Sequence, residues 1–366
     1  MTPPAPAPRR SPVRSRRSCR SSRTAARSIR GPRHRPCLPA RLGEDQKGRA
    51  SSGPPSYYPV AVAAIPPSGQ QYVLTSGDQC AVVTEVGAGL RSYEVDGRDV
   101  IDGYREDEVC PIARGQVLLP WPNRIENGEY EFEGTLYRTP LTEPARHNAL
   151  HGLTRWVKWT ALHQADDHVL MSLVLDPQEG YPFNLRLDVD YRLLAGGLTI
   201  RTTAKNLGRH AAPFGAGHHP YITVGTLIDQ ALLKMPALLR LEANDRLIPT
   251  GRLLPNRGTP FDFLELRPIG SVSMDTAFAS LIPDSDGLIR VHLEAPGSKP
   301  QVTLWMEPVY EFLMVFTPDA IPDVARRRRS IAIEPMTCAP NAFRSGDGLI
   351  VLQPGESWGG SWGILR

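Results

Sequence analysis

Residues 185–193 read Leu-Arg-Leu-Asp-Val-Asp-Tyr-Arg-Leu, so apolar and charged side chains alternate at every position. Because successive side chains of a β-strand point to opposite faces of a sheet, this alternation predicts a strand with one buried face. That face is expected to consist of Leu185, Leu187, Val189, Tyr191 and Leu193. The pair Gly196-Gly197 comes next and is typical of a hairpin turn. The alternation then resumes, which predicts a partner strand with an inward face of Leu198, Ile200, Thr202 and Ala204.

Short strands are also expected on both sides of this hairpin. The sequence predicts them at residues 168–175, 287–293, 302–305, 312–316 and 355–365, and it predicts a second hairpin turn at Asn127-Gly128. The 36 Pro and 32 Gly residues break helix interiors, and no segment shows apolar residues at helical spacing. Many short strands separated by turns indicate an all-β sandwich or barrel, which we place in one domain at residues 71–366.

Composition excludes several classes of protein. No run of about 18 apolar residues occurs, so a membrane-spanning helix and a membrane partner are not expected. Five scattered cysteines match neither a disulfide framework nor a zinc pattern. The net charge of +4 comes from residues 1–50, which hold 14 Lys and Arg against two acids, whereas the remaining residues hold 28 bases and 36 acids. A nucleic-acid partner would therefore depend on this segment alone, and we expect none for the body.

The basic N-terminal segment is predicted to be disordered over residues 1–50, because it lacks the apolar side chains needed to offset its ordering entropy. A polyanion-binding arm, an organelle transit peptide and an extension without a role are the three interpretations of its composition. Residues 51–70 are rich in proline and predict a stiff linker. No convincing export signal is present, so a cytoplasmic location is expected.

Four polar clusters border the predicted strands, where catalytic groups are usually placed. They lie at residues 119–125, 151–152, 215–221 and 333–337. His219 precedes Pro220 and can exchange a proton near neutral pH, unless it is merely a loop histidine bonded to the backbone. Glu334 ends the apolar run 331–333; burial there would raise its pKa and make it a usable base, whereas a solvated strand end would not.

Further polar residues extend this candidate site. His151 offers a second imidazole or an ordinary turn residue. Arg124 offers donors for substrate hydroxyls or a surface ion pair, and Asp275 offers an acceptor for hydroxyl groups or an Asx turn. Cys338 is interpreted as a small buried residue rather than a nucleophile, which would need a partnering base.

Zinc is the main competing interpretation of the histidines. His151, His218, His219 and Glu334 are residue types that bind zinc. None shows the spacing of a helical metal motif, and adjacent His218 and His219 should point to opposite faces of a strand. The sequence also contains no GxGxxG, P-loop or GxSxG motif. We therefore expect neither a metal nor a cofactor.

Taken in order, the clusters resemble the aldose 1-epimerase (mutarotase) family. The resemblance covers roughly residues 71–366 and is carried by Pro120-Trp121-Pro122-Asn123-Arg124-Ile125, Ala149-Leu150-His151-Gly152-Leu153, Pro213-Phe214-Gly215-Ala216-Gly217-His218-His219-Pro220-Tyr221 and Glu334-Pro335-Met336-Thr337. It implies a large antiparallel β-sandwich, the galactose mutarotase-like supersandwich, and cofactor-independent chemistry on a sugar. It further implies His219 as general acid, Glu334 as general base and His151 as second active-site histidine. Arg124 and Asp275 match the sugar-binding pair, with Asn123 beside them.

The resemblance implies that the anomers of an aldohexose interconvert through the open-chain aldehyde. We expect a protonated His219 and an ionised Glu334 to face each other across a groove one pyranose wide, giving a bell-shaped pH–rate profile with both limbs near neutrality. The Glu334-Pro335-Met336 sequence departs from the Glu-Thr-Gln of the galactose-acting pattern, and His218 is an additional histidine. This leaves open a sugar phosphate or sulfonated sugar bound by Arg155 or Arg344, a non-catalytic sugar-binding protein, and a two-carboxylate glycosidase.

Overall fold

The computed structural model describes residues 65–297 and 301–366. The predicted disorder of residues 1–50 and most of the predicted linker lie outside this part of the chain. Nearly all regular structure is β-strand, as predicted. The helices described are the four-residue α1 (Ala342–Ser345) and two 3₁₀ turns, Pro144–Arg146 and Val324–Arg326. None of the helices in the described residues is long and apolar enough to cross a membrane.

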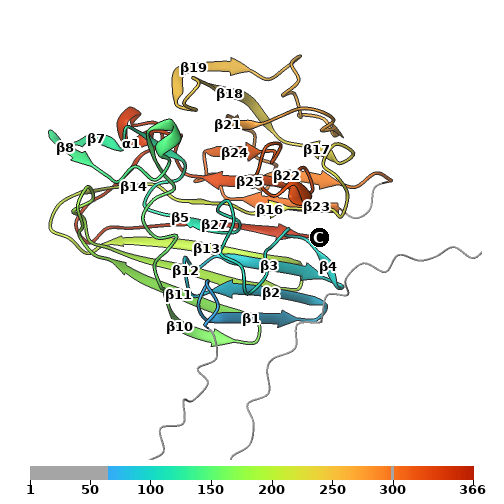
Figure 1. The fold of residues 1–366 in the computed structure, drawn as a ribbon, viewed down its shortest axis with the longest axis horizontal. Coiled ribbons are helices and arrows are strands. Elements are labelled where there is room, and N and C mark those ends of the chain that lie inside the picture. Colours follow the sequence, from blue (N-terminus) through green and yellow to red (C-terminus); the bar gives the residue numbers. More distant parts are fainter. Residues whose placement is uncertain (1–64, 298–300) are drawn as a thin grey trace, which may run out of the picture. The chain divides into compact units, whose positions relative to one another are not determined.

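A nine-stranded antiparallel sheet contains the hairpin that the sequence predicted (Figure 1). In spatial order its strands are β10 (Thr160–Ala165), β11 (His168–Leu175), β12 (Leu185–Leu194), β13 (Gly197–Asn206), β27 (Ser357–Leu365), β23 (Gln301–Met306), β22 (Ile289–Glu294), β17 (Leu232–Lys234) and β20 (Arg267–Pro268). Along β12 and β13 the predicted inward residues are buried in strict alternation, which confirms the period-two prediction.

A second, eight-stranded sheet carries the predicted site. Its order is β19 (Pro249–Pro255), β18 (Ala237–Ala243), β21 (Asp275–Leu281), β24 (Phe312–Phe316), β25 (Ile331–Met336), β15 (Gly217–His218) and β5 (Val117–Leu118), with β16 (Tyr221–Ile222) also paired to β25. One face of this sheet contributes to the main core through Phe278, Leu313, Val315, Ile331 and Ile333. The opposite face bears a separate small cluster that includes Ala277, Met314 and Met336.

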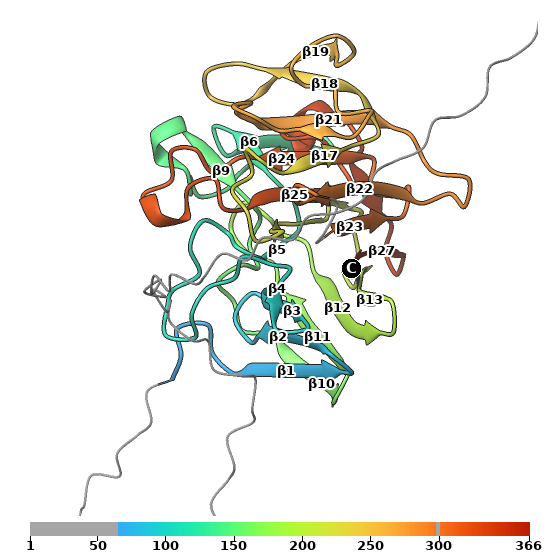
Figure 2. The same ribbon diagram turned by 90° about the vertical axis from the view of Figure 1, so that its right-hand side faces the viewer.

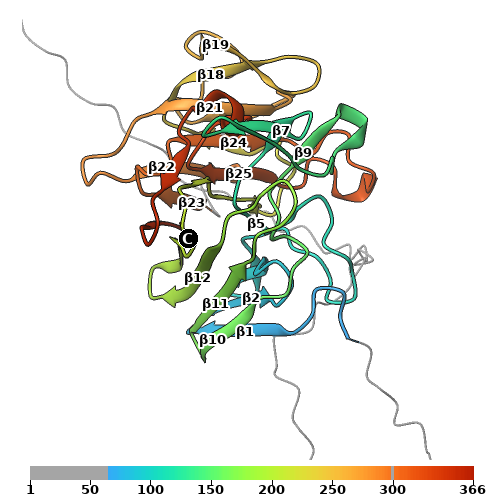
Figure 3. The same ribbon diagram turned by 90° about the vertical axis from the view of Figure 1, so that its left-hand side faces the viewer.

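Four smaller sheets complete the described chain. One is a four-stranded sheet of β1 (Gln71–Ser76), β2 (Gln79–Thr84), β3 (Leu90–Val95) and β4 (Arg98–Asp99). The other three have two strands each: β14 (Ala212–Phe214) with β26 (Ile350–Leu352), β6 (Arg124–Glu126) with β9 (Asn148–Leu150), and β7 (Glu129–Phe132) with β8 (Thr135–Arg138). Strand β1 lies beside β10 to β12 (Figure 2, Figure 3). The main core continues through this interface, where the Tyr191 hydroxyl donates to the Ala88 carbonyl at 2.6 Å.

The Asn127-Gly128 hairpin prediction is wrong in its pairing. Both residues have positive φ, as a tight turn requires, but the flanking strands β6 and β7 pair with β9 and β8 rather than with each other. The reason is a competing partner: the Asn127 N–H donates to the His147 carbonyl, which draws β6 towards β9. The hairpin closes one strand later, at Glu133-Gly134. This pairing matters for function because β6 and β9 lead directly into Arg124 and His151.

Candidate active site

Glu334 occupies the middle of β25, and all six residues of this strand are buried. The expectation that Glu334 ends the apolar strand is therefore wrong, because Glu334 and Pro335 both lie inside β25. Strand β24 pairs with β25 on one side, and β15 and β16 pair with it on the other. The Glu334 side chain is 2% exposed, on the face that also presents Met314 and Met336. The interpretation of Glu334 as a solvated strand end is excluded.

His219 follows β15 and faces Glu334. Its Nε2 lies 3.3 Å from the Glu334 Oε1, and both side chains are buried. Backbone hydrogen bonds fix the position of His219, because its N–H donates to the Gln116 carbonyl and its carbonyl accepts from Gly115. The close approach of this segment needs glycine, since a Cβ on Gly217 would lie 2.7 Å from the Pro122 Cβ. The two side chains touch directly, so they do not stand one pyranose apart as the sequence analysis expected.

Both members of this pair are buried, and each has a polar side-chain atom that makes no hydrogen bond in the described chain. His219 Nδ1 and Glu334 Oε2 have no hydrogen-bond partner within residues 65–297 and 301–366. Such atoms are costly to bury unless a ligand supplies the missing hydrogen bond. Burial lowers the pKa of His219 to about 3 and raises the pKa of Glu334 well above its usual range. Desolvation thus opposes the expected ion pair and favours the neutral forms of both groups.

His151 lies beside His219, with ring centroids 5.4 Å apart. It follows β9 in a left-handed conformation, with φ of 62°. Its Nδ1 accepts a hydrogen bond from the Asn123 backbone N–H at 3.1 Å, so in the neutral imidazole the proton resides on Nε2. Burial and the positive charge of Arg155 keep the pKa of His151 well below its ordinary value. His151 is thus held as a neutral hydrogen-bond donor next to the Glu334–His219 pair.

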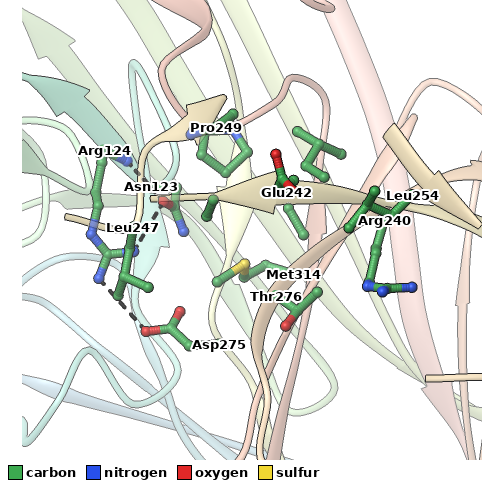
Figure 4. A pocket seen from close by; sticks show the side chains of 14 residues that line it. Asn123, Arg124, Arg240, Glu242, Leu247, Pro249, Leu254, Asp275, Thr276 and Met314 are labelled. Carbon is green, nitrogen blue, oxygen red and sulfur yellow. Dashed lines mark hydrogen bonds and ion pairs between the residues drawn. The ribbon is translucent and has the colours of Figure 1, made fainter. Parts of the chain in front are cut away.

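Arg124 lies at the start of β6 and is buried rather than at the surface. Its Nε and Nη2 bind the two carboxylate oxygens of Glu143 at 2.9 and 3.1 Å, and Nη2 is 3.8 Å from the Asp275 Oδ2. Asn123 accepts from the Arg124 backbone N–H through Oδ1. Figure 4 shows Asn123, Arg124 and Asp275 together at one end of a groove of about 270 Å³. The structure therefore brings all six predicted site residues into one region, although only Asn123, Arg124 and Asp275 line this groove.

The site also contains three residues that were not predicted from the sequence: Glu143, Arg114 and Tyr221. Tyr221 stacks on His219 with ring planes 15° apart and centroids separated by 5.0 Å. The Arg114 guanidinium lies 4.2 Å from the centroid of the Tyr221 ring and binds Asp102 through Nη1. A buried cation thus stands behind the His219 ring and disfavours its protonation. Tyr221 follows the His-Pro pair directly, so its position was the one available sequence signal; Glu143 and Arg114 gave none.

Three further residues considered in the sequence, His218, Cys338 and Arg344, lie outside the Glu334–His219 pair. His218 points away from Glu334, because its Nε2 bonds the Thr202 hydroxyl at 2.9 Å and its ring lies against Trp362; the prediction of opposite faces is confirmed. Burial raises the pKa of Cys338 to about 12, so its thiol is protonated at neutral pH. Arg344 lies 3.8 Å from Glu126 and donates to the Glu129 carbonyl. Across the described ranges, His, Cys, Asp and Glu form no cluster of three suited to a metal ion.

Comparison with known protein families identifies the chain. The aldose 1-epimerase family model matches residues 70–364. This chain belongs to the aldose 1-epimerase family. As a member of this family, it is 32% identical to the uncharacterized protein YihR of Escherichia coli over 291 residues, 79% of this chain and 91% of YihR. It is 29% identical to the maltose epimerase of Levilactobacillus brevis, covering 77% of this chain and 90% of that enzyme.

Solved structures show the same fold. A GalM/aldose epimerase homologue from Caenorhabditis elegans superposes with a TM-score of 0.72 at 18% identity, covering 81% of this chain and 98% of that one. A putative aldose 1-epimerase from E. coli gives a TM-score of 0.69 at 21% identity, covering 81% and 98%. These likenesses confirm the expected galactose mutarotase-like β-sandwich.

Proposed function

We propose that this protein is a mutarotase, which interconverts the α and β anomers of a reducing aldohexose by acid–base opening of the ring. One observation carries this proposal: Glu334 and His219 lie 3.3 Å apart in a buried site, and each has a polar atom without a hydrogen-bond partner in the described chain. The names of the relatives, a maltose epimerase and galactose mutarotases, point to sugars that carry a free anomeric carbon.

The short distance between the two groups suits ring opening. The anomeric hydroxyl and the ring oxygen are bonded to the same carbon, so the base acting on one and the acid acting on the other must lie close together. Glu334 removes the proton of the anomeric hydroxyl while His219 donates a proton to the ring oxygen, which breaks the bond between C1 and the ring oxygen. After rotation about the C1–C2 bond the two groups reverse roles and the ring closes on the other face of C1.

The pair needs one proton to work, and burial decides where that proton resides. Desolvation by the surrounding protein favours a protonated Glu334 and a neutral His219. Sugar hydroxyls that donate hydrogen bonds to the carboxylate stabilise its ionised form and move the proton to the imidazole. His151 Nε2 and the Arg124–Asp275 pair supply the donors and acceptors that hold the remaining hydroxyls.

Polarimetry of freshly dissolved α-glucose and α-galactose tests the proposal. The wild-type protein is expected to accelerate the approach to anomeric equilibrium above the spontaneous rate, and Glu334→Gln to remove most of that acceleration. Arg138→Gln serves as the control, since Arg138 is 70% exposed, pairs with Glu129 on the neighbouring strand β7 and does not line the groove. The proposal would be wrong if the wild-type protein bound the sugar without accelerating mutarotation and His219→Ala still bound it. That result would indicate a non-catalytic sugar-binding protein.

A hexose bearing an anionic group is the second candidate substrate, and Arg155 favours it. Its Nη2 donates to the Leu150 carbonyl, next to His151, and its Nε is buried with no hydrogen-bond partner in the described part of the chain. Within residues 65–297 and 301–366 it forms no salt bridge, whereas Arg344 is engaged by Glu126. If the substrate is anionic, inorganic phosphate or sulfate will compete with it and Arg155→Gln will raise KM for a hexose 6-phosphate. Unchanged KM values and no competition would leave the neutral sugar.

The N-terminal segment is proposed to have no part in this activity. The family match begins at residue 70, and the six predicted site residues all lie between 123 and 334. Removal of residues 1–64 is therefore expected to leave the polarimetric rate per molecule unchanged. A reduced rate with unchanged thermal stability would assign the segment a role in catalysis.

A further inference from the structure

The loop between β18 and β19 contributes to the groove that ends at Arg124 and Asp275. This loop spans residues 244–248, and its Leu247 side chain lines the groove together with those two residues (Figure 4). The loop belongs to the eight-stranded sheet, whereas Arg124 begins β6, which pairs with β9 in a separate sheet. The shape of the groove at this end therefore depends on what holds the loop against β6 and β9.

Arg246 connects the loop to β6, to β9 and to the segments beside them. Its Nε donates to the Arg146 carbonyl at 2.9 Å, and its Nη1 binds the Glu126 Oε1 at 3.1 Å. Its Nη2 donates at 2.8, 2.8 and 3.2 Å to oxygens of the Asn127 side chain, the His147 backbone and the Asn148 side chain. Each nitrogen of the planar guanidinium is thus engaged, which fixes its orientation.

The backbone of the loop is held as firmly as the Arg246 side chain. Asn148, at the start of β9 and 0% exposed, donates from Nδ2 to the Arg246 carbonyl at 3.1 Å. Within the loop, the Asn244 Oδ1 accepts from the backbone N–H groups of Arg246 and Ile248 at 2.9 and 3.1 Å. These hydrogen bonds fix Arg246 on both sides, and Leu247 is the next residue in the chain.

Leu247 adopts a backbone conformation that is unfavourable for leucine. Its φ is 59°, in the left-handed region, where the Cβ of an L-residue lies too close to the following carbonyl oxygen. The residue is only partly buried and lines the groove, so packing in the core does not offset this cost. Strained residues persist where the surrounding contacts hold them, and they concentrate at ligand-binding sites. The strain at Leu247 therefore points to a role in contact with a ligand.

We propose that Arg246 is a positioning residue for sugar binding, which holds Leu247 against the sugar that Arg124 and Asp275 bind. This inference rests on the proposed function, because it takes the hydroxyls of the sugar to be bound by Arg124 and Asp275. A pyranose carries C–H groups beside its hydroxyls, so an apolar side chain next to the two charged groups can contact it and exclude water from their hydrogen bonds. Because this contact is the same before and during ring opening, its loss raises KM and leaves kcat nearly unchanged.

Initial rates of mutarotation, measured by polarimetry over a range of glucose and galactose concentrations, test this role. Leu247→Gly removes the side chain and suits a φ of 59°, so it should raise KM about tenfold without lowering the thermal stability. A purely structural role of Leu247 would not separate these two quantities. Arg246→Met removes the donors and should raise KM by a similar factor, whereas Arg246→Lys retains the charge and some donors and should raise it less.

Arg192→Met is the matched control for Arg246→Met. Arg192 lies on β12 of the nine-stranded sheet, binds Asp190 through Nε and Nη2, and does not line the groove, so the KM of this variant should equal that of the wild type. The double variant Arg246→Met with Leu247→Gly should show no higher KM than Leu247→Gly alone, because Arg246 acts through Leu247. An unchanged KM in Leu247→Gly overturns the proposal even if Arg246→Met fails to fold, and so does an equal rise of KM in Arg192→Met.

Calorimetric titration with the same two sugars separates this inference from the proposed function. If the wild type binds a sugar without accelerating its mutarotation, the proposed function is overturned, and weaker binding by Leu247→Gly and Arg246→Met leaves the role of Arg246 standing. If the wild type accelerates mutarotation and both variants match it in KM and affinity, the role of Arg246 alone is overturned. Absence of both binding and turnover in the wild type overturns both.

Discussion

Adjacent histidines at the end of β15 face two different parts of the molecule. His219 faces the candidate active site, where its Nε2 lies 3.3 Å from Glu334 and its Nδ1 has no partner in the described chain. His218 faces the interior between the two large sheets, where its Nε2 bonds Thr202 of β13 and its ring lies against Trp362 of β27. Burial lowers the pKa of both histidines to about 3.

This contrast shows that burial and a shifted pKa do not by themselves identify a catalytic group. Both imidazoles are held neutral by desolvation, so their charge state is the same at neutral pH. They differ in whether the surrounding protein satisfies their hydrogen bonds. His218 has its partner inside the chain and holds the sheets together, whereas His219 and Glu334 keep atoms available to a ligand.

The largest effect on activity is expected for a change in the candidate active site. Glu334→Gln keeps the shape of the side chain but cannot exchange a proton, so the mutarotation rate should fall by about 10²–10⁴-fold. Thermal unfolding should change little, because a buried carboxyl without a full set of partners is replaced by a neutral amide. Polarimetry and calorimetry on the same preparation separate the two quantities. Retention of the wild-type rate would remove Glu334 from the mechanism.

The opposite pattern is expected for His218→Ala. Loss of the Thr202 hydrogen bond and of contact with Trp362 should lower the free energy of unfolding by about 1–3 kcal/mol, with the rate per folded molecule preserved. The unfolded His218 binds a proton below about pH 6.5, whereas the folded one does so only near pH 3. Wild-type stability therefore falls as pH decreases through this window, and the variant should lose one proton of that dependence. A slower enzyme of unchanged stability would contradict this assignment.

The pH–rate profile reports the protonation of the proposed Glu334–His219 pair. The reaction needs one proton on the Glu334–His219 pair; a second proton binds only near the lowered pKa of His219, and the first leaves near the raised pKa of Glu334. We therefore expect a broad plateau across neutrality, in place of the narrow bell that the sequence analysis predicted.

Replacing Arg114 removes the cation that lies behind the His219 ring. The other titratable or charged groups around His219 are Glu334, His151, Tyr221 and Arg155. Arg114→Met should raise the pKa of His219 and move the acid limb of the profile to higher pH, because a nearby cation disfavours protonation of the imidazole. Arg114→Lys should leave the limbs in place. A lower rate at every pH with unmoved limbs would indicate that Arg114 acts only through the stability of the fold.

The smallest effect is expected for Thr202→Val. This change preserves the volume on β13 but leaves the His218 Nε2 without its partner, so it should cost about 1 kcal/mol of folding stability. Activity and the limbs of the pH–rate profile should match those of the wild type. Chemical denaturation measures the loss, and the double variant with His218→Ala should show less than the sum of the two single effects, because both remove the same bond.

The sequence by itself determined the strands and nominated the two residues of the proposed acid–base pair. Alternation at 185–193 defines a buried face regardless of which strand lies next to it, because the side-chain period of a strand is a local property. The His-Pro and Glu-Pro motifs pointed to His219 and Glu334. The wrong hairpin at Asn127-Gly128 shows the limit of local patterns, because these residues specify a turn but do not specify which strand pairs with β6.

Only the tertiary structure decided how these groups work. Glu143 is bound to Arg124 and Arg114 lies behind Tyr221 because residues far apart in sequence meet in space, and no local pattern encodes such a meeting. The same holds for protonation: the pKa of a carboxyl or an imidazole depends on the water and charges around it, which the fold sets. The sequence supplied a histidine and a glutamate, and the fold buried them with 3.3 Å between Nε2 and Oε1, where desolvation favours the neutral form of each.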